Sequence, residues 1–507
     1  MFEKIKTLGE LGEIASAARA KGSKVVLAHG VFDILHVGHK RHLDIGKRHG
    51  DLLIVTLTTD RFVNKGPDRP VFGEKLRAEM LAALQCVDYV GVSPDPGAEY
   101  VLEIIKPSYY LKGSEYADEE ADVTGRIKTE RQTVEKFGGE VLYTEDITFS
   151  SSNLSNRVMS LYPEETAAYL KDLRSRITVG DVQKEVAAVE KKRCLVIGDA
   201  ILDEYIYVEP LGKPAKENII ATKYKSREVF CGGAVATANL VGQVCASVDL
   251  VTLLGRSQSH EEVIRANLNP HVNLVPFYRE GGQTTVKSRL VDPAYVKKLI
   301  EVAYISDEAL PAAEQATLNG WVEKNIANYD AVIVNDFGHG MIDDGLVDIV
   351  SRKSRFLAVN AQTNSANRGF NLITKYPRAD FICIDEPEAR LAAVERYAPI
   401  ETVVREKLQK KINCHTFVIT HGKLGSIVYT PQAGVKRIPA LTGEAIDTIG
   451  AGDAFFALAS PLLAAGSDPY LAAFIGNAVG AMKVRIVGQR HQITKPEILE
   501  YLSTLLK

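Results

Sequence analysis

The stretch of sequence that decides the fold of the first part of the chain is His29-Gly30-Val31-Phe32-Asp33-Ile34-Leu35-His36-Val37-Gly38-His39. It follows the apolar run 25–28, which predicts a buried parallel strand, and it leads into a helix-forming segment at residues 40–50. A strand, a glycine turn and a helix start therefore meet at His36 and His39. A helix start presents unpaired N–H groups and the positive end of the helix dipole, so this junction is suited to binding polyphosphate.

The histidine pair has two interpretations. An HxxH pair by itself usually caps or solvates a helix end. Here it comes with a glycine, an aromatic residue, an acid and the preceding strand, and the whole string resembles the HxGH signature of the cytidylyltransferase-like nucleotidyltransferase superfamily. It is most similar to the adenylyltransferase domain of the bifunctional heptose 7-phosphate kinase and heptose 1-phosphate adenylyltransferase enzymes. The resemblance implies catalysis by His36 and His39 and nucleotide contacts from Gly30, Phe32, Asp33 and Gly38.

The totals favour a soluble enzyme that acts on small molecules. With 507 residues, 46% of them hydrophobic and 25% charged, the chain can form two or three globular domains. A net charge of -3 gives no support for nucleic-acid binding. The six cysteines show no metal-type spacing, which indicates reduced, mostly buried thiols in a cytoplasmic protein. No apolar run is long enough for a membrane span, so no membrane association is expected.

Strand and helix patterns alternate through residues 1–160, which we assign to the first domain, and they predict a parallel sheet covered on both faces. A second buried strand at 52–57 is followed by a polar loop with Lys65 and Arg69. Ligands of open α/β sheets bind beyond the carboxyl ends of the strands, so both cations can reach phosphate; a solvated basic loop is the alternative. By resemblance, we expect Lys65 to take part in catalysis and Arg69 to bind the nucleotide.

Two further segments complete the predicted nucleotide site. A short strand at 109–116 carries Lys112, and a hydroxyl-rich turn with Ser151 and Ser152 opens a helix. In most proteins such a turn only caps backbone N–H groups. The resemblance implies that Lys112 lines the nucleotide and sugar phosphate site and that the two serines bind the triphosphate.

Two other side chains near this site are interpreted differently. His29 departs from the family, which usually has Asn at that position, and this concerns substrate recognition more than the reaction. Arg77 lies in the helix predicted at 72–84, where we expect a structural ion-pair partner rather than a catalyst.

Residues 161–190 predict a charged helical connector with apolar positions at helical spacing and a break at 179–181. The connector holds no catalytic constellation. The second domain is assigned to residues 191–507.

The second domain begins with a strand pattern at 194–205 that carries Asp199 and Asp203. Two carboxylates four residues apart can hydrogen-bond the hydroxyl groups of a sugar, although a solvated helix cap uses the same residue type. A Gly232-Gly233 turn then enters a helix that carries Asn239, which is a weak signal when taken alone.

A stronger signal is the string Asp447-Thr448-Ile449-Gly450-Ala451-Gly452-Asp453-Ala454-Phe455. Its small residues let the amides of residues 450–452 approach a γ-phosphate at a helix start. Asp453 is then placed to take the proton of a substrate hydroxyl, a general-base role worth about 10²–10⁴-fold in rate. Packing glycines at a helix entrance would explain part of this string, but seldom the acid as well.

This string resembles the signature of the ribokinase-like, PfkB-type sugar kinases, and the resemblance extends over residues 190–507. It implies a large α/β domain with a small β-lid, formed by residues 204–230 and by strands near 283–305. It also implies the site residues. ATP is expected at Gly422, Gly425, Gly450, Ala451 and Gly452, Mg²⁺ at Asp385 and Glu388, and the substrate at Asp199, Asp203, Gly232, Gly233 and Asn239.

Three departures from the heptose kinases concern the kinase pocket. Ala236 stands where those kinases have Asn, Asp385 replaces the usual Asn, and residues 359–362 replace a segment that looks like Ile-Asp-Pro-Lys. An unmatched buried polar group costs about 1–3 kcal/mol, so the loss of an Asn that contacts the sugar is significant. The pocket therefore favours another sugar phosphate or a weaker kinase, while the intact Asp453 favours activity over inactivity.

Together the motifs predict an α/β protein in which a Rossmann-like HxGH nucleotidyltransferase domain precedes a ribokinase-like domain with a β-lid. We interpret it as an ATP- and Mg²⁺-dependent sugar-phosphate kinase joined to a nucleotidyltransferase, with small-molecule sugar phosphates and nucleotides as partners and an activated heptose as product. One alternative is the same chemistry on another sugar or polyol phosphate with CTP. Another is an active nucleotidyltransferase with a sensing, degenerate kinase domain. The resemblance also suggests a homodimer or higher assembly.

Overall fold

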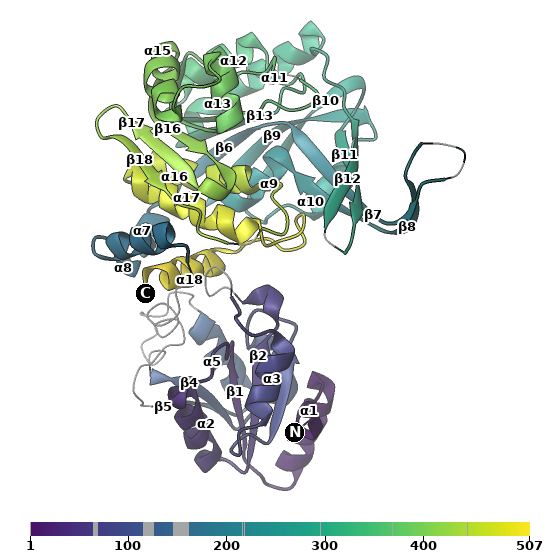
Figure 1. The fold of residues 1–507 in the computed structure, drawn as a ribbon, viewed down its shortest axis with the longest axis vertical. Helices are drawn as coiled ribbons and strands as arrows, with labels where there is room; N and C mark the ends of the chain where they lie inside the picture. Colours follow the sequence, from purple (N-terminus) through teal and green to yellow (C-terminus); the bar gives the residue numbers. More distant parts are fainter. Residues whose placement is uncertain are drawn as a thin grey trace. The chain divides into compact units, whose positions relative to one another are not determined.

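The computed structural model describes residues 2–63, 69–114, 126–144, 162–214, 216, 218–294, 296–367, 369–443 and 445–507. They form two α/β units (Figure 1). The first unit comprises Met1–Val179 and Pro496–Lys507, and the second comprises Gly180–Lys495. Among the described helices, none combines the length and the apolar character that crossing a bilayer requires. The six cysteines are free thiols and all but Cys86 are buried, as predicted.

A parallel sheet of five strands organises the first unit, in the order β3-β2-β1-β4-β5. Its strands are β1 (Val25–Gly30), β2 (Leu52–Thr58), β3 (Tyr89–Ser93), β4 (Tyr109–Gly113) and β5 (Glu140–Thr144). The strand order reverses between β1 and β4, which is the point where open α/β sheets bind ligands. The predicted Rossmann-like architecture is confirmed.

Helices cover both faces of this sheet because each presents one apolar stripe to it. Leu43 of α2 and Leu81 of α3 belong to the core on one face, and Leu11 of α1, Leu102 of α4 and Val134 of α5 belong to the core on the other. The bounds are α1 (Leu8–Ala20), α2 (Val37–His49), α3 (Glu74–Ala82), α4 (Glu99–Ile105) and α5 (Arg126–Lys136).

Arg77 of α3 is fully buried, and its guanidinium joins several backbone segments of this unit near the HxGH turn. Its guanidinium donates to the carbonyl oxygens of Val31 at 2.5 Å, Thr58 at 2.8 Å and Phe72 at 2.9 Å. It also pairs with Asp60 at 2.6 Å. The expected structural role of Arg77 is therefore confirmed.

The connector contains two helices, α7 (Glu164–Arg174) and α8 (Val179–Ala188). The break predicted at residues 179–181 is wrong, because these residues form the first turn of α8 and the break lies at 175–178. Asp181 favours a helix start electrostatically, and Val182 and Val186 are buried one turn apart. The last helix, α18 (Lys495–Leu506), returns to α7, where the Arg174 guanidinium donates to the carbonyl of Leu505 at 3.0 Å.

The second unit is built on a nine-stranded sheet in the order β10-β9-β6-β13-β14-β15-β16-β17-β18. The strands from β10 to β16 are parallel, and β17 and β18 are antiparallel. Their bounds are β6 (Arg193–Gly198), β9 (Ser247–Ser257), β10 (Val272–Gln283), β13 (Ala331–Asp336), β14 (Leu357–Ala361), β15 (Arg378–Asp385), β16 (Asn413–Thr420), β17 (Ser426–Thr430) and β18 (Gly434–Ile438).

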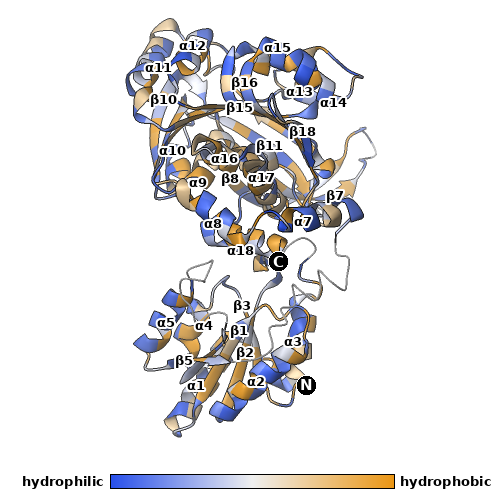
Figure 2. Cartoon of the chain, turned by 90° about the vertical axis from the view of Figure 1, so that its left-hand side faces the viewer, coloured by the Kyte–Doolittle hydropathy of each residue, from blue (hydrophilic) through white to orange (hydrophobic). Residues whose placement is uncertain are grey.

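Helices α9 (Gly233–Val241), α16 (Ala451–Ala464) and α17 (Pro469–Lys483) lie on one face of this sheet, and α11 (Ala312–Asn325), α12 (Asp344–Lys353) and α13 (Glu386–Ala393) lie on the other (Figure 2). Helix α17 is apolar almost all round, as expected of a helix buried within a domain. The shorter helical segments are α10 (Glu261–Ala266), α14 (Ile400–Thr402), a π-helical turn (Val403–Leu408) and α15 (Gln409–Lys411).

A smaller sheet of four strands, in the order β12-β11-β7-β8, forms the predicted lid. Its strands are β7 (Ala200–Gly212), β8 (Ala221–Gly232), β11 (Thr285–Asp292) and β12 (Lys297–Tyr304). β7 starts two residues after β6 ends, so the chain passes from the large sheet to the lid at Asp199. The lid is confirmed close to the expected ranges.

Candidate active sites

The HxGH histidines lie at the start of α2, beyond the carboxyl end of β1, as the sequence predicts. His36 is the N-cap residue of α2, and its Nδ1 accepts the N–H of Gly38 at 3.1 Å. The rings of His36 and His39 are stacked with centroids 3.9 Å apart, and Phe32 meets His39 edge-on at 5.5 Å. Both histidines therefore lie at the end of α2 where the helix dipole attracts phosphate.

The hydrogen bond to Gly38 decides which nitrogen of His36 carries the proton. Because Nδ1 accepts an N–H, the neutral ring must carry its hydrogen on Nε2. The Nε2 atom is buried and hydrogen-bonds to none of the described residues. Burial also lowers the pKa of His36. The turn thus holds a neutral imidazole whose buried Nε2–H has no hydrogen-bond partner among the described residues.

Asp33 and Arg69 form a buried ion pair behind this turn. Asp33 Oδ1 also accepts the N–H groups of Val71 at 2.7 Å and Phe72 at 3.1 Å. Phe32, which directly precedes Asp33 in the chain, has a left-handed φ of 49°. Gly30 lies against the Phe32 ring, where an added Cβ would make a tight contact at 3.3 Å. The structure therefore places Asp33 and Arg69 in the wall of the site, where they hold the turn in shape.

Lys112 and His29 lie at the ends of neighbouring strands. The Lys112 ammonium pairs with Glu130 of α5 at 2.6 Å. His29 hydrogen-bonds through Nδ1 to the hydroxyl of Thr56 at 2.9 Å across the strand pair. Burial, together with the charges of Lys112 and Arg126, lowers the pKa of His29 to about 3, so its imidazole is neutral at pH 7. The predicted site residues Lys65, Ser151 and Ser152 lie outside the described residues.

In the second unit the structure separates the two aspartates that the sequence groups together. Asp203, on lid strand β7, forms a buried ion pair with Arg289 of β11. Its charge raises the pKa of Asp453, which shows that Asp203 belongs to the surroundings of the expected base. A Cβ at Gly232 would lie only 2.3 Å from Asp203 Oδ2, so a larger residue there would displace this carboxylate.

Asp199 faces a different part of the large domain. Its Oδ2 accepts the N–H groups of Phe337 at 3.0 Å and His339 at 3.5 Å, in the loop after β13. Burial and the nearby Asp336 raise the pKa of Asp199 to about 7. Gly233 has φ 57° and would place a Cβ 2.5 Å from the Asp199 carbonyl oxygen. Asp199 and Gly233 thus shape the junction between the sheet and the lid.

Asp453 lies in the first turn of α16, which Gly450 begins with a φ of 79°. It lines a narrow cavity of ≈ 60 Å³ together with Phe230 of the lid, Asn239 and Lys483. Burial and the charge of Asp203 raise the pKa of Asp453 to about 6. Asn239 uses both ends of its amide within the fold, donating to the Asn267 carbonyl at 2.8 Å and accepting the Asn269 N–H at 2.9 Å.

A second cavity of ≈ 680 Å³ adjoins the same helix start. It is lined by four of the residues expected at ATP, namely Gly422, Gly425, Ala451 and Gly452. Gly425 has φ 85°, and a Cβ there would lie 2.0 Å from the carbonyl oxygen of Ile438, so the turn after β16 needs glycine. The size suits a drug-sized or nucleotide-sized ligand.

Asp385 and Glu388, the expected metal residues, lie in the wall of this larger cavity. Asp385 caps α13 by accepting the N–H of Glu388 at 2.7 Å, and Glu388 accepts the N–H groups of Asp385 at 2.8 Å and Thr363 at 3.0 Å. Burial and the neighbouring Asp385 charge raise the pKa of Glu388 to about 8. The described residues contain no cluster of three or more His, Cys, Asp or Glu side chains suited to a metal. The pair therefore fits Mg²⁺ only when phosphate oxygens and water complete the shell, which is how Mg²⁺ usually binds.

Sequence reasoning assigned no role to three polar side chains of this site, although Gln362 belongs to the segment 359–362 that departs from the heptose kinases. Gln362 donates to Asp453 Oδ1 at 3.0 Å, Arg289 pairs with Asp203, and Lys287 of β11 lowers the pKa of Asp453 by its charge. Gln362 directly follows β14, and residues after parallel strands are candidates for ligand sites. Lys287 and Arg289 lie on lid strand β11. No local sequence pattern predicts that this strand lies near the start of α16.

Comparison with known proteins matches each unit to a different family. Residues 27–157 match the model of the cytidylyltransferase-like family, and residues 191–496 match that of the pfkB family of carbohydrate kinases. These matches confirm the resemblances drawn from the HxGH string and from residues 447–455, and they confirm the order of the two domains.

Among curated relatives, the bifunctional protein HldE of Geobacter metallireducens is 38% identical over 168 residues, and that of Trichlorobacter lovleyi is 39% identical over 168 residues. Each alignment covers 32% of this chain and 32% of the relative, so the chain spans about a third of the length of the curated relatives that it matches. A phosphofructokinase-2 variant from Escherichia coli superposes with a TM-score of 0.51 at 12% identity, over 63% of this chain and 100% of that one. This likeness shows a shared fold.

Proposed function

Since the chain belongs to the pfkB family of carbohydrate kinases, we propose that its second unit phosphorylates a sugar phosphate with ATP and that its first unit transfers a nucleotidyl group to a sugar 1-phosphate. One observation carries the kinase assignment. The first turn of α16 borders both cavities, because Gly450 and Asp453 line the smaller one while Ala451 and Gly452 line the larger one. A hydroxyl substrate and a nucleotide can therefore meet at this turn.

The kinase step follows from that arrangement. Asp453 accepts the proton of the sugar hydroxyl as its oxygen attacks the γ-phosphorus of ATP, and the bond between the γ-phosphorus and the β–γ bridging oxygen breaks. ADP leaves, and the proton passes from Asp453 to solvent. The amides at the head of α16 stabilise the charge on the transferred phosphoryl group. When Mg²⁺ is bound near Asp385 and Glu388, it supplies further neutralisation of the phosphate charges.

In the first unit, the Nε2–H of His36 and the start of α2 would bind the phosphates of the nucleotide. An oxygen of the sugar 1-phosphate attacks the α-phosphorus, and the bond from that phosphorus to the bridging oxygen breaks, which releases pyrophosphate. The protein's part is to align the reactants and stabilise charge. We propose the same site for Lys65, Ser151 and Ser152, on the basis of the sequence alone.

We propose heptose as the sugar, supported by the identity to the HldE proteins. The same reaction types on another sugar or polyol phosphate with CTP form the second candidate. It is favoured by Ala236, which lines the pocket beside Asp453 where the heptose kinases have Asn. A degenerate, sensing kinase domain is the third candidate. The homodimer or higher assembly and the cytoplasmic location stay predictions from the sequence.

Mass spectrometry of reaction products tests these candidates. The purified protein with Mg²⁺ would receive heptose 7-phosphate or heptose 1-phosphate, each with ATP or with CTP. We expect a heptose bisphosphate from the first substrate and a nucleotide-linked heptose from the second. A product from the second substrate only would support the sensing kinase domain. The absence of both products would remove heptose as the substrate, and a panel of other sugar and polyol phosphates would then test the two reaction types.

A further inference from the structure

Gln362 follows β14 and is hydrogen-bonded to the proposed base of the kinase. Its Nε2 donates to Asp453 Oδ1 at 3.0 Å, and among the described residues no other side chain donates to this carboxylate. We propose that Gln362 is a positioning residue for phosphoryl transfer, which holds the Asp453 carboxylate in one orientation and favours its ionised form. This inference rests on the proposed kinase function and adds a residue that neither the sequence motifs nor the family matches assign.

The backbone of Gln362 is fixed on both sides. Its N–H donates to the carbonyl of Asp336 at 2.8 Å. Its own carbonyl oxygen accepts the side-chain amides of Asn367 at 3.0 Å and Asn371 at 3.2 Å. Three hydrogen bonds therefore fix the backbone of Gln362. Its side-chain amide reaches Asp453 from this rigid backbone.

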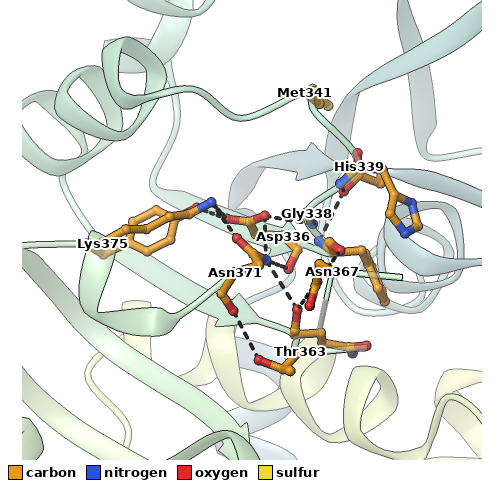
Figure 3. Close-up of polar contacts among 12 residues, drawn as sticks. Asp336, Gly338, His339, Met341, Thr363, Asn367, Asn371 and Lys375 are labelled. Carbon is orange, nitrogen blue, oxygen red and sulfur yellow. Dashed lines mark hydrogen bonds and ion pairs between the residues drawn. The ribbon is translucent and has the colours of Figure 1, made fainter. Parts of the chain in front are cut away.

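Asp336, at the end of β13, anchors this support (Figure 3). Its carboxylate is 1% exposed, and its Oδ2 accepts the Tyr376 hydroxyl at 2.7 Å and pairs with Lys375 at 2.5 Å. Its Oδ1 accepts the N–H of Gly338 at 3.1 Å and the Asn371 amide at 3.0 Å. A buried polar network with its acceptors satisfied in this way is rigid.

The loop after β14, which carries Gln362, also contacts Glu388, a carboxylate that is proposed to hold Mg²⁺. Thr363 donates its N–H to Glu388 at 3.0 Å, and its hydroxyl donates to the Asn371 carbonyl at 3.2 Å. Adjacent residues of one supported loop thus contact the base and the carboxylate that would hold Mg²⁺. Because one loop contacts both groups, their positions relative to each other are fixed. Precise alignment is the main requirement of phosphoryl transfer.

The charges around Asp453 explain why an amide at this position matters. Asp203 and burial raise the pKa of Asp453, Lys287 and Lys483 lower it by their charges, and the Gln362 hydrogen bond lowers it further. The charge of Asp453 also acts on the Glu388 carboxyl and the Cys383 thiol, raising the pKa of each. A carboxylate can only accept, so the NH₂ end of the amide must face it. Gln362 therefore favours the carboxylate without adding a charge.

The test compares pH profiles of kcat for the full-length protein. Removing one hydrogen bond to a charged group shifts a pKa by about one unit, so we expect the acidic limb of the Gln362→Leu profile to move up by about one pH unit. Gln362→Glu should move it in the same direction, because it adds a like charge. Gln362→Lys should move it down, because an ammonium group favours the carboxylate. Because Gln362 also lines the larger cavity, the KM for ATP is measured for each variant; a changed KM with an unmoved acidic limb would show that Gln362 serves the nucleotide and would overturn the positioning role.

Gln315→Leu is the matched control, because Gln315 is a buried glutamine of the same unit whose amide donates to Asn319 at 2.9 Å and to the Met341 carbonyl at 3.3 Å. Its profile should coincide with that of the unmodified protein. Equal profiles for all the Gln362 variants would overturn the positioning role while leaving the kinase assignment intact. If Gln362→Leu does not fold, the opposite shifts of the Glu and Lys variants still decide the question.

A titration without substrate separates this inference from the proposed function. The full-length protein would carry ¹³C at the aspartate γ-carbons, and the Asp453 signal would be assigned by its loss in Asp453→Asn. A higher pKa of this carboxyl in Gln362→Leu supports the coupling of the two residues, and an unchanged pKa overturns it. An unmodified protein that phosphorylates no sugar phosphate would instead overturn the kinase assignment, and with it the role of Gln362 in transfer.

Discussion

The hydroxyl of Tyr205 donates to Asp447 Oδ2 at 2.7 Å, which ties the first lid strand to the loop that precedes α16. Asp447 also accepts the Lys298 ammonium of β12 at 2.6 Å and the Gly488 N–H at 2.9 Å. The carboxylate is 1% exposed, so it depends on these donors. The lid and the head of α16 are therefore coupled through one buried charge.

Tyr205→Phe should loosen this coupling. The change leaves the buried Asp447 with one donor fewer, and we expect a loss of about 1–3 kcal/mol in the stability of the second unit. The KM for the phosphorylated sugar should rise, because the lid contributes Phe230 to the cavity beside Asp453. Urea unfolding and steady-state kinetics measure the two effects. Tyr429→Phe is the control, since the Tyr429 hydroxyl hydrogen-bonds to no described residue; equal losses in both variants would contradict the role of the Asp447 contact.

Single substitutions should separate the two proposed activities. Asp453→Asn removes the base and should lower kinase turnover by about 10²–10⁴-fold while nucleotidyl transfer continues. His36→Ala removes the Nε2–H donor and the N-cap of α2, and it should suppress pyrophosphate release while phosphorylation continues. Product assays on the same preparations measure both reactions, and each variant serves as the folding control for the other. Phosphorylation that persists in Asp453→Asn would show that another group takes the proton.

Kinase activity should depend on pH through Asp453. Its pKa is raised to about 6 in the folded protein. Because the base must be ionised, kcat/KM should be constant above this pKa of the free enzyme and fall about tenfold per pH unit below it. Protonation of Asp453 lowers the reaction rate, but it raises the free energy of unfolding. A carboxyl whose folded pKa exceeds its unfolded value binds protons more tightly when folded, so protonation between pH 6 and pH 4 contributes stability. A profile of kcat/KM without an acidic limb near pH 6 would contradict the assignment.

Gly232→Ala tests the close approach of β8 to Asp203. The new Cβ would lie 2.3 Å from Asp203 Oδ2 and would push the carboxylate and its partner Arg289 out of place. We expect a loss of about 1–3 kcal/mol from the strain, together with weaker binding of the sugar phosphate. Gly320→Ala is the control, because no atom lies within 4 Å of its added Cβ, and in the interior of α11 alanine should stabilise by about 0.5–1 kcal/mol. Calorimetry and binding measurements compare the two variants; normal binding by Gly232→Ala would remove Asp203 from the substrate site.

Much of the fold and part of the site could be predicted because the signals are local. The strand at 25–28, the glycine turn and the helix start place His36 and His39 within about one turn of helix, whatever surrounds them. The same holds for Gly450, Ala451, Gly452 and Asp453 at the start of α16, whereas the lid was expected from the resemblance to the PfkB-type kinases. The break in the connector was misplaced by a few residues, because helix boundaries are weakly encoded. The strand pattern at 194–205 is divided at Asp199 between the large sheet and the lid.

The sequence by itself determined which short segments form phosphate-binding helix starts, and through the two motifs it determined the two families. Only the tertiary structure decided that Asp203 and not Asp199 belongs with Asp453, that Asp33 and Arg69 pair inside the wall of the first site, and that Gln362 supports the base. Gln362 and Asp453 are 91 positions apart in the chain. Their contact depends on the order and register of the strands, and these are set by packing of the whole sheet rather than by the local pattern of residues.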